Sequence, residues 1–339
     1  MAETRAHEPE LMPGSSPLSA DARRPWRSAL SRVNQPIIVW LLVLAAFALS
    51  GLFSSNFPSW ALVSSTIVLG LFLAVIAFGQ GLIILTGGID LSVPASVALG
   101  AFFTGYFATR GFPTVLAIIV GVGIASLVGL VNGLIISRST FPPFIVTLST
   151  FAIATSLLLG ISKSNPGQKA PRELTALFDG SLTVIGVPVP LVLFVAFAAL
   201  GLWVQSGTVF GRRTYAIGNS VRAAEVAGLK VRSTTLFVYW CAAVAYGLGG
   251  VLLLGYGSGS DLNIGAAWLL PSIAAVVVGG SSISGGSGSY LGTLGAAVLL
   301  TALSIDISAA GSSEGVKQVF YGCLIFLALL LTRLGGVRR

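Results

Sequence analysis

The chain has 339 residues, a mean hydropathy of +0.93 and only 9% charged residues. A soluble domain carries roughly a quarter charged residues, so most of this chain cannot face water. The net charge is +8, but no polar domain gathers the basic residues, which excludes a nucleic-acid-binding surface.

The N-terminal stretch, residues 1–35, is polar and contains four prolines. It lacks the early apolar core of a secretory signal, so we expect a disordered cytoplasmic tail. The single histidine, His7, lies in this tail, and histidine-based catalysis or metal binding has no support. Cys241 and Cys323 both lie in apolar runs, where they predict small buried residues rather than metal ligands or a disulfide.

Ten apolar segments follow the tail, and a membrane-crossing helix needs about 20 such residues. We therefore predict an all-α membrane protein, a polytopic bundle of about ten transmembrane helices within residues 36–333. The third and eighth segments contain Gly and Ser, and we expect them to be broken or only partly spanning. The ten segments lie near 36–53, 61–86, 92–109, 113–137, 143–161, 188–206, 235–256, 267–282, 290–307 and 316–333.

Basic residues favour cytoplasmic loops, and their positions test this count. With both ends in the cytoplasm, all but five of the 19 basic residues lie inside. The inside set then includes the loop 207–234 and the basic C-terminus 334–339. The five outside residues are Arg110, Lys163, Lys169, Arg172 and Lys317. The longest outside segment, Ser162–Val187, is either a plain connector or a short surface helix that meets an external partner.

The fourth segment carries four small residues, Gly121, Ala125, Gly129 and Gly133, at intervals of four. Residues four apart share one helical face, and small side chains there let a second helix approach closely. We assign this stripe a packing role and no chemistry.

The stretch GGIDLSVPAS, Gly87–Ser96, places a carboxylate between two apolar segments. An ionised side chain at bilayer depth costs several kcal/mol, so Asp90 must be satisfied locally. Gly87 and Gly88 permit a break in the second segment, and Asp90 or Ser92 can cap the third helix. The break is either purely structural or helps to shape a translocation path, as broken helices do in transporters.

Two Gly/Ser-rich stretches, Val276–Thr293 and Gly311–Gln318, resemble phosphate-binding loops in composition only. The first lacks the Lys-Ser/Thr pair of a Walker A loop, and the second fails its spacing. We expect a tight turn with close helix contacts at 276–293. The chain therefore needs no cofactor of its own, and any ATP and Mg²⁺ would be bound by another polypeptide.

A polar stretch from Tyr215 to Val231 interrupts the apolar pattern. Asn219 is expected to be the N-cap and Gly228 the C-terminal stop of a two-turn helix. Ala223, Ala224 and Ala227 then share a flat face, next to Arg222. A membrane-surface helix would carry larger apolar residues, so this helix is either inserted into a protein groove or a solvated linker.

Three stretches together resemble the permease subunits of bacterial ribose-type sugar ABC importers. They are GQGLIILTGGIDLSV (Gly79–Val93), FGRRTYAIGNSVRAAEVAGLKV (Phe210–Val231) and SIAAVVVGGSSISGGSGSYLGTLGAAVL (Ser272–Leu299), in matching order and separation. The resemblance covers roughly residues 36–333. Pro94 stands where a glycine is usual, and Ile305–Gly322 resembles the family less than the three motifs do.

The resemblance implies a type II importer permease in the bacterial inner membrane, working with a second copy of itself or a paralogous permease. It also implies a cytoplasmic ATPase, a periplasmic or lipid-anchored solute-binding protein and a monosaccharide substrate. The stretch Tyr215–Val231 then holds the coupling helix that docks on the ATPase. Its expected coupling residues are Gly218, Asn219, Arg222, Ala223, Ala224 and Gly228.

Four polar residues inside apolar segments are expected to line the path: Gln80, Thr86, Asn132 and Thr147. Taken singly, each is equally explained by a hydrogen bond between helices. A competing hypothesis is an ion-coupled secondary transporter, for which Asp90 and Asp306 are the acidic candidates. A membrane enzyme would need a nucleophile–base pair or metal ligands, which the apolar segments do not offer. A nucleoside, polyol or amino acid is the alternative to a sugar on the same scaffold.

Overall fold

The computed structural model describes residues 25–50, 60–163 and 168–336, and these residues are almost entirely helical. Residues 25–34 belong to a separate unit of the chain, and the helix bundle belongs to the unit Gln35–Arg339. The long helices are α1 (Pro25–Ser50), α2 (Trp60–Leu85), α3 (Val93–Ala108), α4 (Thr114–Ile136), α5 (Pro143–Ser162), α7 (Val189–Leu202), α8 (Val209–Asn219), α10 (Val231–Gly257), α11 (Leu269–Val278), α12 (Tyr290–Ala309) and α13 (Glu314–Gly336). The short elements are α6 (Arg172–Ala176), α9 (Val221–Val226), the π-helical turn η1 (Trp203–Gly207), the 3-10 turn η2 (Ala266–Trp268) and the hairpin β1 (Thr183–Val184) and β2 (Val187–Pro188).

The predicted all-α membrane fold is confirmed, since each of the ten apolar segments coincides with a helix. Six helices within the described residues are long and apolar enough to cross a membrane: α2, α4, α5, α7 with η1, α10 and α12. The third and eighth segments form the shorter helices Val93–Ala108 and Ala266–Val278, as their Gly and Ser content predicted.

The N-terminal helix differs from the prediction, because it begins at Pro25 within the stretch assigned to a tail. A proline in the first turn of a helix has no amide hydrogen to lose, so Pro25 is compatible with a start there. Residues 1–24 and 337–339 lie outside the described part of the chain, and so does most of the expected disordered tail.

Helices α2 and α10 lie at the centre of the bundle, while α4, α5 and α7 lie at its edge. The most apolar stretch of α2 is 72% buried, and that of α10 is 61% buried, whereas the value for α7 is 17%. Ile119, Ile153 and Val195 of the outer helices are each more than half exposed. Exposed apolar side chains in such density suit lipid rather than water.

The predicted stripe of small residues on α4 packs against α10. A Cβ on Gly129 would lie 2.2 Å from the carbonyl oxygen of Tyr239, and one on Gly133 would lie 2.8 Å from that of Leu236. The two backbones therefore approach more closely than any larger residue allows. This contact fixes α10 against α4 next to the break between α2 and α3.

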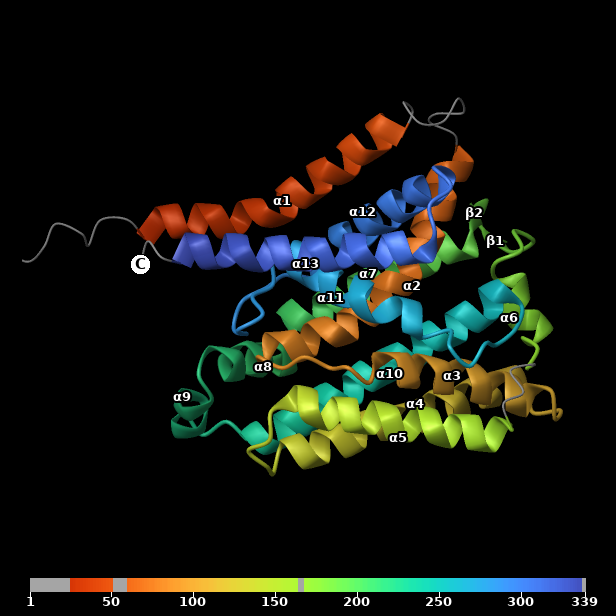
Figure 1. Ribbon diagram of the computed structural model, residues 1–339, viewed down its shortest axis with the longest axis horizontal. Coiled ribbons are helices and arrows are strands. Elements are labelled where there is room, and N and C mark those ends of the chain that lie inside the picture. Colours follow the sequence, from red (N-terminus) through yellow and green to blue (C-terminus); the bar gives the residue numbers. More distant parts are fainter. Residues whose placement is uncertain (1–24, 51–59, 164–167, 337–339) are drawn as a thin grey trace, which may run out of the picture. The chain divides into compact units, whose positions relative to one another are not determined.

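The two ends of the bundle carry different elements (Figure 1). The α8–α9 segment projects at one end, on the left of the view, and α6, the β1–β2 hairpin and the α12–α13 turn lie at the other. The predicted outer loop 162–187 does contain a short helix, α6, which is anchored by the buried Leu174. Thr114 donates a hydrogen bond of 2.8 Å to Glu173 in this region.

Candidate functional site

Helix α8 begins directly after the π-helical turn η1 and is fixed at its first residue. Thr208 is the N-cap, and its hydroxyl accepts a hydrogen bond of 3.1 Å from the Gly211 amide. A Cβ on Gly211 would lie 2.0 Å from the Gln205 carbonyl oxygen, so only glycine fits there. The Gln205 side chain accepts a bond of 2.6 Å from the Tyr290 amide, which ties the start of α8 to the start of α12.

The C-terminal end of α8 meets the end of α2 and the loop between α11 and α12. The Gly286 amide donates to the Leu85 carbonyl at 2.9 Å, and a Cβ on Gly218 would lie 1.8 Å from that same oxygen. The Asn219 Nδ2 donates to the carbonyls of Tyr215, at 2.9 Å, and Gly286, at 3.2 Å. We call this cluster of Leu85, Tyr215, Gly218, Asn219 and Gly286 the junction.

Tyr215 adds a second link across the junction. Its hydroxyl donates a bond of 2.8 Å to the carbonyl of Gly288 in the α11–α12 loop. Burial raises the pKa of the Tyr215 hydroxyl above its usual value, so the group remains a protonated donor at neutral pH. All three sequence motifs, far apart along the chain, therefore meet at one place, and the predicted tight turn at 276–293 is part of it.

The predicted N-cap role of Asn219 is wrong, because Ser220 caps α9. The Ser220 hydroxyl accepts a bond of 3.2 Å from the Ala223 amide, and its backbone is extended. Asn219 is instead the last residue of α8, where its amide nitrogen serves as a donor to two carbonyls. Both residue types are good N-caps, so the sequence does not decide between neighbours.

The predicted stop at Gly228 agrees with the structure. Its φ is +77°, in the left-handed region that favours glycine. The Gly228 amide donates to Glu225, and the Leu229 amide donates to Ala224, which is the hydrogen-bond pattern of a Schellman motif. Helix α9 is therefore a short, well-capped element rather than an irregular linker.

The surface of α9 differs from the predicted flat alanine face. Ala224 is turned inward and only 4% exposed, whereas Ala223, Ala227 and Arg222 are exposed. Val226 is 85% exposed, although it is apolar. The outward surface of α9 therefore combines two exposed valines, Val221 and Val226, with alanines and with the charged residues Arg222 and Glu225.

The break between α2 and α3 lies just beyond the junction. Gly87 has a φ of +81°, which ends α2, and a Cβ on Gly88 would lie 2.6 Å from the Tyr239 hydroxyl. Asp90 is fully buried, and its Oδ1 accepts bonds from the Ser92 amide and hydroxyl at 2.7 and 2.6 Å. Ser92 is at the N-cap position of α3 but makes no side-chain cap bond, since its hydroxyl donates to Asp90 instead.

A buried polar network extends from the break into α4 and α5. The Asn132 Nδ2 donates to the Ser92 hydroxyl at 2.9 Å, and the Thr150 hydroxyl donates to the Asn132 Oδ1 at 2.6 Å. The Thr147 hydroxyl accepts a bond of 3.0 Å from the Leu91 amide. Two of the four predicted path residues, Asn132 and Thr147, are therefore brought together around Asp90.

The other two predicted path residues lie elsewhere. Gln80 accepts a bond of 2.9 Å from the Tyr246 hydroxyl within the α2–α10 contact. Thr86 donates to the carbonyl of Ile83 at the end of α2. Sequence reasoning missed Thr150 and Tyr246, and their signal was the same as for the others: a hydroxyl group within an apolar run.

Three fully enclosed polar atoms near the break have no partner among the described residues: Asp90 Oδ2, Gln80 Nε2 and the Tyr239 hydroxyl. Such atoms are costly in a static interior, which suggests that water or another conformation satisfies them. The same described residues contain no group of three His, Cys, Asp or Glu that could hold a metal ion.

The comparisons with known proteins give the family of the chain. The family described as "Branched-chain amino acid transport system / permease component" matches residues 62–329. The ribose import permease protein of Bacillus subtilis is 37% identical, over 76% of this chain and 80% of its own length. The fructose import permease protein of Rhizobium meliloti is 33% identical, over 87% of this chain and 84% of its own.

A third relative is the autoinducer 2 import system permease protein of Yersinia enterocolitica. It is 32% identical, over 76% of this chain and 79% of its own length. No solved structure matches the chain. The family match runs from α2 into α13 and so includes the junction and the break, and the chain belongs to this family of transport-system permease components.

Proposed function

We propose that this chain is the translocation subunit of an ATP-driven importer of monosaccharides. Two of the relatives are import permeases for ribose and for fructose, and the match covers about four fifths of each. The family description speaks of amino acids, but the relatives that are named for a sugar match 76% and 87% of this chain. These relatives do not favour the ion-coupled alternative.

The observation that carries the coupling role is the exposed side of α9. A single apolar residue that is 85% exposed, Val226, lies on a rigidly capped helix beside Arg222. Burial of a valine side chain is worth roughly 1.5–3 kcal/mol, so a groove on a partner protein would gain by covering it. We assign that groove to a cytoplasmic ATPase, which binds the ATP and Mg²⁺ that this chain does not.

The junction supplies a path from the ATPase to the break. A force on α9 passes through α8 to Leu85 and Gly286, because Gly218 and Asn219 contact both segments directly. Leu85 ends α2, and Asp90 follows within five residues, so displacement of the junction reaches the polar network around Asn132. Alternating access then follows from the rearrangement of a broken helix, as in other transporters.

The proposed orientation places α9 in the cytoplasm together with both chain ends. The opposite end, with α6 and the β1–β2 hairpin, then faces a periplasmic or lipid-anchored solute-binding protein. A second copy of the chain, or a paralogous permease, completes the path. The assembled importer lies in the bacterial inner membrane.

Purification tests the proposal directly. The full-length protein, tagged at its C-terminus, is extracted gently from its native membrane, and the proteins that co-purify are identified by mass spectrometry. We expect a stoichiometric ATPase, and ATP-dependent uptake of a monosaccharide by the reconstituted complex. A protein that purifies without partners and transports in vesicles without ATP would contradict the proposal and restore the ion-coupled alternative.

A further inference from the structure

A cavity of about 210 Å³ opens at the end of the bundle opposite α9. It is lined by α2, by the turn η2 with α11, by α12 and by the first turns of α13. Its side chains of chemical interest are Trp268, Thr301, Ser304, Glu314, Lys317 and Tyr321. This volume lies below the roughly 300–1,000 Å³ of pockets for drug-sized ligands, so the cavity suits a small solute.

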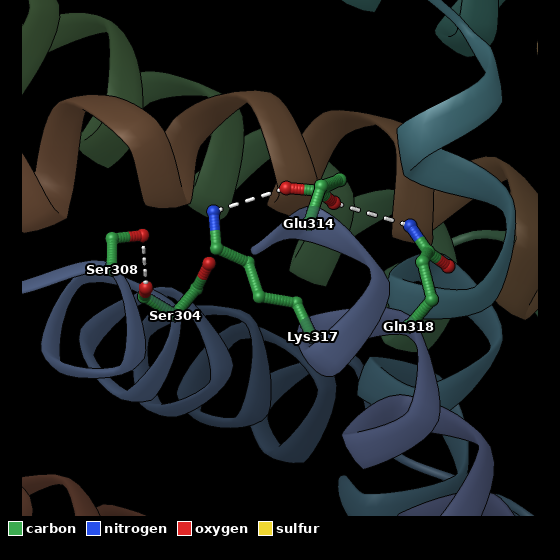
Figure 2. Close-up of polar contacts among 5 residues, drawn as sticks. All are labelled: Ser304, Ser308, Glu314, Lys317 and Gln318. Carbon is green, nitrogen blue, oxygen red and sulfur yellow. Dashed lines mark hydrogen bonds and ion pairs between the residues drawn. The ribbon is translucent and has the colours of Figure 1, made fainter. Parts of the chain in front are cut away.

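The polar side of the cavity is an ion pair between Glu314 and Lys317, and Gln318 also contacts the Glu314 carboxylate. Lys317 Nζ lies 3.0 Å from Glu314 Oε2, and Gln318 Nε2 donates to Glu314 Oε1 at 3.3 Å. Figure 2 shows these contacts, with Ser304 on the neighbouring helix. The Lys317 side chain is only 19% exposed, although its ammonium group carries three donors and uses one on Glu314. Donors therefore remain for a ligand.

Two aromatic residues also line the cavity, Tyr321 on the same face of α13 as the ion pair and Trp268 in the turn η2. Tyr321 is only 5% exposed, and the Trp268 ring packs edge-to-face on Phe72, with ring centroids 6.3 Å apart. Such rings present an apolar face together with a polar edge group, which suits a ligand that is apolar on one side and polar on the other. The Ser304 hydroxyl adds a further polar group, whereas the Thr301 hydroxyl donates to the Ala297 carbonyl at 2.8 Å and remains only an acceptor.

The balance of charge decides the class of ligand. Glu314 and Lys317 neutralise each other, so the cavity offers no surplus charge to a ligand with a net charge, such as a carboxylate or a phosphate. It offers several hydrogen-bonding groups of both kinds together with two aromatic rings. A neutral, ring-shaped compound with several hydroxyl groups matches this combination of size, polarity and charge.

The position of the cavity agrees with entry of such a compound. Tyr290, at the first turn of α12, is tied to Gln205 near α8, whereas Ser304 lies 14 residues further along the same helix. At 1.5 Å per residue, the cavity is about 20 Å from that end. Under the proposed function, on which this inference rests, this is the side where solute arrives.

We infer that this cavity is a monosaccharide-binding site on the permease itself, at the outer entrance. The Glu314–Lys317 pair and Ser304 bind the hydroxyl groups, and Trp268 and Tyr321 contact the ring. Part of the substrate selectivity of the importer then resides in this chain.

Cysteine protection tests the binding. Ser304→Cys and Ser308→Cys are made in the full-length chain with Cys241 and Cys323 replaced by alanine. Ser308 is the matched control, since it lies one turn further along α12, is exposed and does not line the cavity. With the assembled importer in lipid nanodiscs, we expect D-ribose or D-fructose to slow maleimide labelling at position 304 and to leave position 308 unchanged.

Transport kinetics give the second measurement. Ser304→Leu, which fills the cavity, and Lys317→Met, which removes the donor, should each raise the KM for the transported sugar about tenfold. Ser308→Leu should leave the KM within a factor of two of that of the unmodified protein. Membrane level and ATPase association are measured for each variant, so that a folding defect is recognised.

The outcomes separate this inference from the proposed function. If the importer transports a monosaccharide but that sugar does not protect position 304, and KM is unchanged in Lys317→Met, the site is wrong and the proposed function stands. If the assembled importer transports no monosaccharide, both fail. Protection at 304 together with a raised KM in both cavity variants establishes the site.

Discussion

At the residue scale, Asn219 connects α8 to the α11–α12 loop through its side-chain amide. The Asn219→Ala substitution removes two hydrogen bonds at an exposed position, each worth roughly 0.5–1.5 kcal/mol at most. We therefore expect the variant to fold and to bind the ATPase, but to transport fewer solute molecules per ATP hydrolysed. Uptake and ATP hydrolysis measured on the same proteoliposomes give this ratio.

Ser220→Ala is the control for Asn219→Ala, because it removes the neighbouring N-cap bond but no contact of the junction. It should lower the stability of α9 by about 1 kcal/mol and leave the ratio of uptake to hydrolysis unchanged. An unchanged ratio in Asn219→Ala would show that the junction does not transmit the movement.

Asp90 distinguishes a structural carboxylate from an ion-coupling one. In Asp90→Asn, the Oδ1 acceptor for the Ser92 amide and hydroxyl is kept, and the new amide faces the space where Oδ2 lacks a partner. We expect transport close to that of the unmodified protein. Asp90→Ala removes the acceptor and leaves the amide and hydroxyl donors of Ser92 without it in a buried site, at a cost of roughly 1–3 kcal/mol.

Thermal unfolding of the purified variants and uptake in vesicles check both substitutions of Asp90. A stable, assembled Asp90→Asn protein without transport would favour a titrating carboxylate. A melting temperature lowered only in Asp90→Ala, with transport kept in Asp90→Asn, would establish the structural role.

At the element scale, α9 carries an apolar side chain, Val226, that the described part of the chain leaves exposed. Val226→Glu places a charge where a valine is 85% exposed, so the fold itself should tolerate it. We expect loss of ATPase association by at least about tenfold, since a buried unpaired charge is strongly unfavourable at an interface. Ala224→Trp would be a poorer test, because Ala224 lies on the buried side of α9. A large ring at that position would displace the helix itself.

Ile185→Glu is the matched control for Val226→Glu, since Ile185 is 99% exposed on the β1–β2 hairpin at the opposite end of the bundle. Co-purification of the ATPase with each variant is compared at equal amounts of permease. ATPase retained equally by both variants would remove α9 from the docking surface.

The elements differ in how far the sequence predicted them. Each of the ten apolar runs coincides with a helix, and six helices of the described residues are long enough to span, because bilayer thickness constrains helix length directly. The glycines at 87 and 228 marked their turns, because a positive φ is readily available only to glycine. The network around Asp90 was only partly predicted, since Asn132 and Thr150 meet through tertiary packing of α4 and α5 and no local pattern encodes that contact.

The role of Asn219 shows the same limit at a shorter range. Asn and Ser are almost equally favourable as N-cap residues. The sequence therefore predicted the helix α9 correctly but assigned its N-cap to Asn219, one residue before Ser220. The Gly286 carbonyl that Asn219 actually contacts lies 67 residues further along the chain. Only the fold brings these two residues together.

At the scale of the whole molecule, the junction belongs to the end of the bundle that carries α8 and α9, and the cavity is lined by residues near the α12–α13 turn. Figure 1 shows these elements at the two ends of the bundle. The buried core of α2 runs between them, because Leu73 lines the cavity and Leu85 belongs to the junction. A rearrangement of α2 at its break would therefore change the positions of residues in both the cavity and the junction. This continuity connects ATP-driven movement on one side of the membrane with solute entry on the other.

The orientation of the bundle in the membrane can be tested with two exposed residues. Val226→Cys and Ile185→Cys, in a chain whose native cysteines are replaced, place single thiols at the two ends. A membrane-impermeant maleimide applied to spheroplasts should label position 185 alone, and inverted vesicles should expose position 226 alone. Because basic residues surround α9 and favour the cytoplasm, we expect this pattern rather than its reverse. Labelling of position 226 from outside would place α9 away from any cytoplasmic ATPase, and labelling of both positions from one side would contradict the assignment of these two loops to opposite faces of the membrane.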